Sequence, residues 1–211
     1  MKHITKYREP EAFTQWKREA NESWQPTYGG IPGEVKQIVK ESLRSEQGNI
    51  CCYCERELSD IDSHIEHFIP QSAPDVDPLD YTNLLCSCQN RTEKGEPRHC
   101  GSLKEDWYDP ILLISPLAHD CEEHFAFTGD GLLKPSVHND AAALETIERL
   151  GLGIPKLNDL RAKVIDPFLD DSLSGDEVAT FVSGYLSRDT AGHFSAFWTT
   201  IRYLFGDYVR A

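Results

Sequence analysis

The segment between residues 51 and 100 decides how this 211-residue sequence is interpreted. Its spaced elements, in chain order, are Cys51-x-x-Cys54, Glu66-His67-Phe68-Ile69-Pro70, Asn83, Cys88 and Cys100. Two well-separated cysteine pairs are typical of a structural metal site. A carboxylate-histidine step before a proline is typical of a catalytic metal site. The sequence therefore predicts two kinds of metal chemistry in one short region.

The cysteines predict a structural zinc site. Zinc takes four ligands in a tetrahedron, and a Cys-x-x-Cys turn supplies two of them. The expected ligands are Cys51, Cys54, Cys88 and Cys100. Cys86 would pack in the core, although it shares a strand face with Cys88, so this choice is not forced. Cys52 and Cys121 are expected to lie outside the site. The competing interpretation treats all seven cysteines as small buried hydrophobes.

Composition is that of a soluble globular protein, with 39% hydrophobic and 27% charged residues. No apolar run reaches the length of a membrane helix, and no apolar stretch follows the N-terminus as in a signal peptide. We therefore expect a cytoplasmic protein without membrane contact. In a reducing compartment, clustered cysteines favour metal binding over disulfides, and an odd count argues against a disulfide framework.

The net charge of −14 constrains the partners. The chain has 21 basic and 35 acidic residues. Contacts with phosphates need a basic footprint, so this charge argues against a protein that grips nucleic acid alone. The acidic net charge predicts either a partner protein that presents the nucleic acid or a local basic surface that the net charge of the whole chain does not reveal.

Periodicity and turn residues predict an α+β fold that is predominantly helical. Helices are expected over 10–21, 32–48, 103–108, 141–150, 155–165, 176–186 and 195–209. Extended segments are expected over 50–58, 65–69 and 125–133, the first and last as hairpins, while 79–90 brings the chain back to the metal-motif region. The predicted division is an N-terminal helical segment (1–48), a metal-motif region (49–110), and a hairpin with C-terminal helices (111–211) that forms a partner interface.

Glu66, His67 and Asn83 are the expected catalytic residues. Glu66 would bind a hard divalent cation, Mg²⁺ or Mn²⁺. His67, with a pKa near neutrality, would accept a proton from the attacking water. Asn83 would hydrogen-bond His67 and orient it. Taken as isolated residues, Glu66 would be interpreted as a solvated carboxylate and His67 as a surface or hydrogen-bonded core histidine. Their position between the cysteine pairs favours the catalytic interpretation instead.

These motifs resemble the HNH endonucleases, and more narrowly the PtuB-like HNH proteins of Septu and retron anti-phage defence. The matching stretches are His64 to Ser72, Tyr81 to Cys88, His99 to Lys104, Asp109-Pro110, Gly129-Asp130-Gly131 and Thr146 to Leu152. The resemblance implies an embedded, zinc-clamped ββα-metal motif that cleaves phosphodiester bonds of DNA, with RNA such as tRNA as the other substrate. It also implies control by a PtuA-like ABC/SMC-type ATPase. In retron versions a reverse transcriptase and its RNA–DNA product would join the assembly.

Two positions depart from the family pattern. Glu66 stands where Asp or His is usual, and Gly101 stands where a metal-binding His or Asn usually follows the last cysteine. Residues that could supply the missing ligand are Asn90, His99, Asp62, His64 and Asp106. The polar loop 89–99 is unusually long between the last two cysteines. Its Arg91, Lys94 and Arg98, with Lys104, are the expected nucleic-acid contacts; an ordinary charged surface loop is the competing interpretation.

A second function fits the same residues. In it the chain is a non-catalytic zinc-binding adaptor that recruits the ATPase through its C-terminal helices, and Glu66 and His67 are structural. A His67→Ala protein with full biological activity would favour the adaptor.

Overall fold

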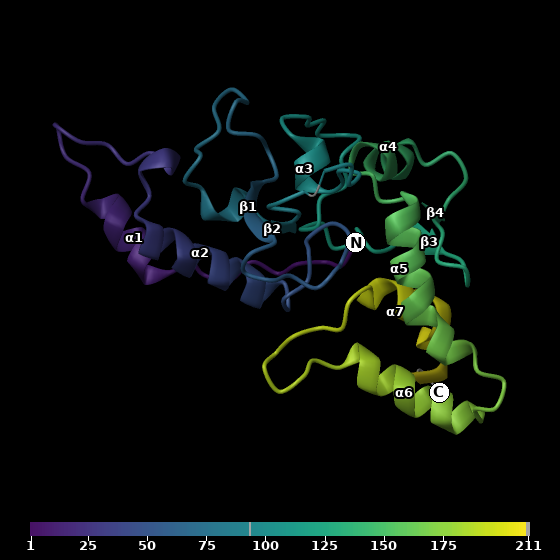
Figure 1. Cartoon of the computed structure of the whole chain (residues 1–211). Helices are drawn as coiled ribbons and strands as arrows, with labels where there is room; N and C mark the ends of the chain where they lie inside the picture. The colour runs from purple at the N-terminus through teal and green to yellow at the C-terminus, as the bar shows by residue number, and fades with distance from the viewer. Residues whose placement is uncertain (93, 210–211) are drawn as a thin grey trace.

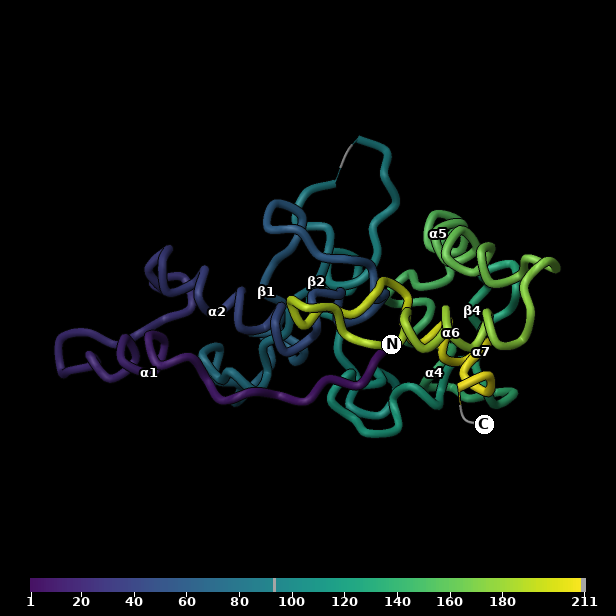
Figure 2. Tube along the Cα trace, turned by 90° about the horizontal axis from the view of Figure 1, so that it is seen from below, coloured from purple at the N-terminus to yellow at the C-terminus, as the bar shows by residue number. Residues whose placement is uncertain are grey.

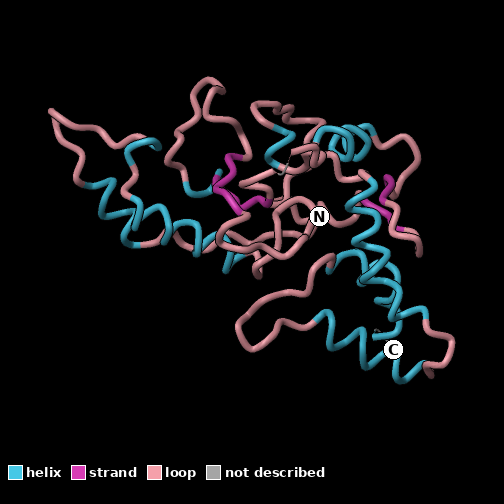
Figure 3. The backbone as a smooth tube through the Cα atoms, in the orientation of Figure 1, coloured by secondary structure: helices cyan, strands magenta, loops and turns pink. Residues whose placement is uncertain are grey.

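The structure is a computed structural model that describes residues 1–92 and 94–209. Its seven described α-helices are α1 (Glu11–Arg18), α2 (Gly33–Glu46), α3 (Gly101–Lys104), α4 (Ala141–Arg149), α5 (Pro155–Ile165), α6 (Gly175–Leu186) and α7 (Trp198–Phe205). Its described strands are β1 (Ser63–His67), β2 (Leu84–Cys88), β3 (Phe125–Phe127) and β4 (Leu133–Pro135). Helices and two small sheets therefore share the chain, as the α+β prediction requires, with long loops between them (Figure 3).

The elements are spread along an elongated arrangement. Helices α1 and α2 lie side by side at one end, and α5, α6 and α7 lie at the other (Figures 1 and 2). The β1–β2 pair and α3 lie between these ends, with α2 packed against both strands and α3 against β2. The region that carries the cysteine and Glu66-His67 motifs is thus central and is contacted from more than one side.

The first two helices follow their sequence signals. Pro10 and Pro32 precede α1 and α2, where the missing N–H of proline has no cost. Beyond α2, Gly48 adopts φ +64°, and a Cβ atom there would stand 2.3 Å from the ring of Phe194. Only glycine fits this turn, which leads the chain straight into the first cysteine pair.

Strands β1 and β2 form an antiparallel pair. Ser63 pairs with Cys88, Ile65 with Cys86, and His67 with Leu84, so these residues lie on one face. Glu66 pairs with Leu85 and belongs to the other face, on which α3 packs. The strand prediction over 65–69 is confirmed in kind, although the observed strand begins and ends two residues earlier.

Buried apolar residues form two clusters. The larger one surrounds the cysteines and includes residues from Met1 to Leu157, so it draws on all three segments of the predicted division. The smaller one consists of Ile165, Val178, Val182, Ile201 and Phe205, contributed by α5, α6 and α7. The three-part division stays a prediction.

Two helix predictions need correction. The expected helix over 103–108 is instead the single turn α3, which ends at Lys104 because Glu105 adopts φ +49°. The expected helix over 195–209 begins only at Trp198, since Phe197 is left-handed at φ +54°. The helix over 155–165 has the predicted bounds. Within the described residues, no helix is long and apolar enough to cross a membrane.

Candidate metal centre and the Glu66-His67 strand

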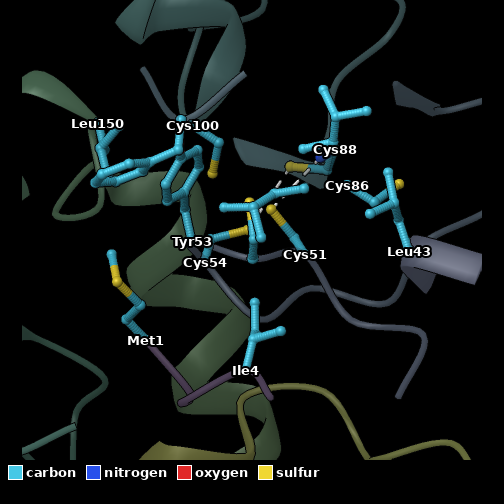
Figure 4. Packing of buried hydrophobic residues seen from close by; sticks show 14 of the residues in the cluster. Met1, Ile4, Leu43, Cys51, Tyr53, Cys54, Cys86, Cys88, Cys100 and Leu150 are labelled. Carbon is cyan, nitrogen blue, oxygen red and sulfur yellow. Dashed lines mark hydrogen bonds between the residues drawn. The ribbon is translucent and has the colours of Figure 1, made fainter. Parts of the chain in front are cut away.

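Four cysteine sulfur atoms converge at one point of the core. The Sγ atoms of Cys51, Cys54, Cys88 and Cys100 all lie within 4.8 Å of one another, and all four residues are buried. Figure 4 shows these side chains turned toward each other, with Cys86 directed away toward Leu43. The geometry therefore brings Cys88 and Cys100, and not Cys86, together with Cys51 and Cys54, which is the set expected from the sequence. Cys52 and Cys121 also lie outside the cluster, as expected.

The cluster has the dimensions that zinc requires. Four ligands at about 2.3 Å around a tetrahedral ion stand roughly 3.8 Å apart. The Sγ atoms of Cys54 and Cys88 are 3.7 Å apart. This spacing is far longer than a disulfide bond, which measures about 2.05 Å. The residues therefore fit a structural zinc ion.

The ionisation of the four thiols points in the same direction. Burial raises the pKa of Cys54, but hydrogen bonds with Cys100 and Cys88 outweigh it and bring the pKa to about 7. The pKa of Cys100 is raised well above its usual value, by burial and by the neighbouring sulfur atoms. Four thiols so close together thus ionise only in part by themselves, whereas a bound dication would favour the thiolate form of each.

Local backbone and second contacts hold the ligands in place. Cys100 adopts φ +56° and Glu55, directly after Cys54, adopts φ +63°, conformations that cost non-glycine residues on the order of 1–3 kcal/mol. The backbone N–H of Cys88 donates to Sγ of Cys51 at 3.4 Å. Nδ1 of His99 lies 3.1 Å from Sγ of Cys100. Such hydrogen bonds orient thiolate ligands from outside the tetrahedron.

The Glu66 carboxylate is buried beside the cysteine centre. Its Oε1 accepts hydrogen bonds from the Tyr53 hydroxyl at 3.1 Å and forms an ion pair with Nζ of Lys104 at 3.0 Å. Its Oε2 lies 3.6 Å from Nε2 of His64. Burial raises the pKa of Glu66, but the hydrogen bond with His64 and the charge of Lys104 outweigh it, so the pKa is lowered and the group is ionised. Tyr53 lies inside the Cys-x-x-Cys turn, which links Glu66 to the cysteine centre.

The His67 ring is held on the opposite face of β1. Its Nε2 lies 3.0 Å from the carbonyl oxygen of Pro78, and the ring of Tyr28 meets it edge-on at 4.6 Å. A carbonyl can only accept, so Nε2 carries the proton and Nδ1 keeps its lone pair. Burial lowers the pKa of His67, which the Pro78 hydrogen bond only partly offsets. The imidazole is therefore neutral at pH 7, with Nδ1 as its basic atom.

The prediction that Asn83 hydrogen-bonds to His67 is wrong. The Asn83 side chain instead accepts from the backbone N–H of Ile69 and donates to the carbonyl of the same residue, both at 2.8 Å. These two bonds fix the backbone directly after the Glu66-His67 pair. The carbonyl of Pro78, and not the Asn83 side chain, orients the His67 ring.

Three proteins of bacterial defence systems resemble this chain. No family model matches it. A Vibrio cholerae serotype O1 biovar El Tor protein, described as the candidate HNH endonuclease of retron Vc95, is 33% identical over 139 residues, covering 63% of this chain and 65% of that protein. The Escherichia coli protein given the same description for retron Ec83 is 28% identical over 210 aligned positions, covering 80% of each chain. Septu protein PtuB of Bacillus mycoides (strain KBAB4) is 27% identical over 122 residues, covering 46% of this chain and 41% of PtuB.

The chain is similar to the HNH proteins of retrons and to the Septu protein PtuB. In its alignment with the Vibrio cholerae relative, the chain spans 65% of that protein. The predicted recognition, made on the stretches around Glu66-His67, Asn83 and the last cysteines, is confirmed by these relatives.

Lys104 does not have the position expected of a nucleic-acid contact. Its side chain is 1% exposed, pairs with Glu66, and donates to the backbone carbonyl of His67 at 3.1 Å. A direct contact with a phosphate outside the protein is therefore not open to it. Arg91, Lys94 and Arg98 are exposed on the 89–99 loop, and Arg98 pairs with Glu105. Their role in binding nucleic acid stays a prediction.

The five residues that could supply the ligand missing at Gly101 differ in where they lie relative to Glu66. Asn90 is exposed beyond the end of β2, whereas Glu66 pairs with Leu85 near the start of that strand. His99 contacts the cysteine centre, Asp62 pairs with Arg56 at 2.6 Å, and Asp106 is exposed. His64 alone among these five has a described contact with Glu66. Sequence reasoning named His64 without preferring it, and missed Tyr53 altogether.

Proposed function

We propose that this protein is a metal-dependent HNH endonuclease that cleaves phosphodiester bonds of nucleic acid, with DNA as the favoured substrate. The observation that carries the proposal is the succession β1, β2, α3 around the cysteine centre, with Glu66 and His67 on β1 and Lys104 on α3. This succession matches the strand–strand–helix order of a ββα-metal motif. The names of the relatives support the same activity.

His67 acts as the general base in this proposal. Its protonated Nε2 is fixed by the Pro78 carbonyl, which leaves Nδ1 free of a bound proton. Nδ1 meets only the amide of Gln71, at 3.4 Å, a long contact that an attacking water could replace. A neutral imidazole at pH 7 can accept the proton of that water as it attacks phosphorus.

In this proposal Glu66 binds a divalent cation beside the scissile phosphate, and its neighbours fix the position of the surrounding backbone. A divalent cation bound there would polarise the phosphate and stabilise the leaving oxygen. The ionised Glu66 carboxylate suits such a cation as a hard oxygen ligand. Lys104 binds both the Glu66 carboxylate and the His67 carbonyl, which keeps these adjacent residues in one fixed relation at the end of β1. Asn83 fixes the following turn through Ile69.

The structural zinc supplies the rigidity that this small region lacks. Cys51 and Cys54 flank Tyr53, whose hydroxyl donates to Glu66, while Cys88 ends β2 and Cys100 precedes α3. One ion bound by the four thiolates would join every element that carries a catalytic residue. Metal binding then contributes folding free energy and preorganises the site.

We propose that a PtuA-like ABC/SMC-type ATPase controls the nuclease. The similarity to Septu protein PtuB supports this partner, and the net charge of −14 suits a nuclease to which another protein presents nucleic acid. The retron relatives support a reverse transcriptase and its RNA–DNA product as further components. The C-terminal helices offer an apolar groove lined by Val164, Phe168, Phe181 and Tyr185, suited to a protein partner.

That groove also favours the second candidate function, a zinc-binding adaptor without catalysis. Phe181, which lines it, is 53% exposed and offers apolar surface to a partner. An adaptor would need the groove and the zinc, but not the neutral His67 base. The two functions therefore differ in what they require of His67.

The test is plasmid nicking with Mg²⁺ or Mn²⁺, with and without the ATPase, using the wild type, His67→Ala and the exposed-histidine control His138→Ala. Metal analysis should give about one zinc per chain in all three proteins. We expect His67→Ala to lose cleavage by a factor of about 10²–10⁴, the usual contribution of a general base. His138→Ala should cleave normally. Equal cleavage by wild type and His67→Ala would refute the mechanism, and zinc without cleavage under any condition would favour the adaptor.

A further inference from the structure

His64 and Glu66 present two metal-binding atoms at one point of the β1 surface. They are two residues apart on a strand, so their side chains share a face. Nε2 of His64 lies 3.6 Å from Oε2 of Glu66. Two ligands about 2.1 Å from one octahedral or tetrahedral ion stand roughly 3.0–3.4 Å apart. A small side-chain rotation would bring the pair to that separation.

The opposing element leaves space for these two atoms and supplies no ligand of its own. Gly101, the first residue of α3, faces the pair directly. A Cβ atom on residue 101 would stand 2.4 Å from Oε2 of Glu66 and 2.9 Å from Nε2 of His64. A ligating side chain from this helix position and the present His64–Glu66 arrangement therefore exclude each other. The backbone of α3 closes over the site, and the second ligand comes from β1 instead.

The remaining contacts leave the two facing atoms available. Lys104 and Tyr53 both bind Oε1 of Glu66, so Oε2 is the oxygen free to take a cation. Nδ1 of His64 is buried and has no hydrogen-bond partner among the described residues. Without a cation, a proton on Nε2 can be shared with Oε2, whereas with the proton on Nδ1 the lone pair of Nε2 faces Oε2 and both atoms can bind one cation. The His64 side chain is 23% exposed, which leaves a route from solvent.

We propose that Nε2 of His64 and Oε2 of Glu66 together bind the catalytic divalent cation, and that this mixed pair favours Mn²⁺ over Mg²⁺. Mg²⁺ prefers oxygen ligands and retains its water shell, whereas an imidazole ligand suits first-row transition cations. His64 thereby takes over, from the adjacent strand, the ligand position that Gly101 does not fill. The proposal rests on the nuclease function but concerns metal binding, which can be measured without cleavage.

The experiment is a Mn²⁺ titration of the zinc-loaded protein, followed by electron paramagnetic resonance of the free ion. Four proteins are compared: wild type, His64→Ala, His64→Gln and the control His138→Ala. Removing a direct ligand should weaken Mn²⁺ binding by more than the roughly 10–100-fold loss that is typical when a residue outside the ligand set is removed. The control should bind as wild type does, and zinc content reports whether each variant has folded. Wild type should bind Mn²⁺ more tightly than Mg²⁺ in a competition titration.

A measurement on the wild-type protein alone keeps the proposal testable even if a His64 variant fails to fold. Electron spin-echo modulation of wild-type Mn²⁺ should contain the nitrogen coupling of a directly bound imidazole, because the zinc centre offers only sulfur. Absence of that coupling, or unchanged Mn²⁺ affinity in a zinc-loaded His64→Ala protein, would overturn the assignment while leaving the nuclease open to other ligands. If His64→Ala loses Mn²⁺ binding and wild type never cleaves, the ligand assignment holds and the proposed function fails.

Discussion

The cysteine centre and the C-terminal helices are held together by different forces. Around the centre, short strands and a one-turn helix converge on four buried sulfur atoms, and residues next to or within the cysteine set, such as Glu55, Gln89 and Cys100, have positive φ. In the C-terminal cluster, α5, α6 and α7 pack ordinary aliphatic and aromatic side chains against each other. A structural zinc site in a small domain supplies about 10–16 kcal/mol of folding free energy, whereas each buried aliphatic side chain supplies about 1.5–3 kcal/mol. Stability should thus depend on one ion in the first region and on many small contributions in the second.

A bound metal ion would explain how so small a region can hold strained backbone. Residues such as Cys100 and Glu55 adopt conformations that apolar packing alone rarely maintains. A metal centre fixes them because each ligand must reach the same point. The C-terminal helices need no such constraint, since capping and packing suffice.

The largest effect should come from a matched pair of substitutions on β2. Cys86 and Cys88 are both fully buried and share a face of the same strand, but only Cys88 belongs to the metal cluster. We expect Cys88→Ala to abolish zinc binding and unfold the centre, while Cys86→Ala keeps one zinc and costs about 0.5–3 kcal/mol, as ordinary core substitutions do. Zinc analysis and hydrogen exchange of both proteins would check this. Zinc retained by Cys88→Ala would mean that Cys86 can replace it as ligand.

A smaller effect is expected in the C-terminal cluster. Ile201 is fully buried between α5 and α6 in that cluster. Ile201→Ala should lower the free energy of unfolding by about 2–5 kcal/mol through lost burial and a residual cavity. Its zinc content should stay that of the wild type, as measured by metal analysis beside urea unfolding. If zinc is lost as well, the two regions fold as one unit and the contrast between them is weaker than we infer.

The smallest effect concerns the start of α6. Ser174 and Glu177 form a capping box, in which the backbone N–H of Glu177 donates to the Ser174 hydroxyl and the Glu177 carboxylate accepts from the N–H of Ser174. Ser174→Ala should cost about 1 kcal/mol of stability. Ser183→Ala, an exposed change in the same helix, should be neutral or slightly stabilising because alanine is the better helix former. Equal thermal stability of the two variants would show that the cap contributes nothing here.

The two regions meet through Glu55. Its carboxylate accepts from the backbone N–H of Thr199 at 2.8 Å, and its carbonyl accepts from the N–H of Phe197 at 2.9 Å. The residue that follows Cys54 of the cysteine cluster therefore holds the start of α7. This contact also accounts for the left-handed Phe197, which no local signal predicted. A partner protein on the C-terminal helices would have a direct structural connection to the metal centre.

Local patterns in the sequence were sufficient for several features of the fold and the site. The Cys-x-x-Cys turn and the second pair were sufficient to predict the four cysteines whose sulfur atoms converge, although the choice of Cys88 over Cys86 was not forced by the sequence. Pro155 and the apolar spacing after it gave the bounds of α5, and the Thr128-Gly129-Asp130-Gly131 turn marked the β3–β4 hairpin. The motif around Glu66-His67 was sufficient to predict the family that the relatives confirm.

Other features depended on contacts between distant segments. The partners of Asn83 and His67, the burial of Lys104 against Glu66, and the choice of His64 beside Gly101 follow from how β1, β2 and α3 pack. A sequence states which donors and acceptors exist, but hydrogen bonds and ion pairs extend only about 3 Å. Which of them meet is decided by the tertiary structure, because side chains that are far apart along the chain reach that distance only after the backbone is folded.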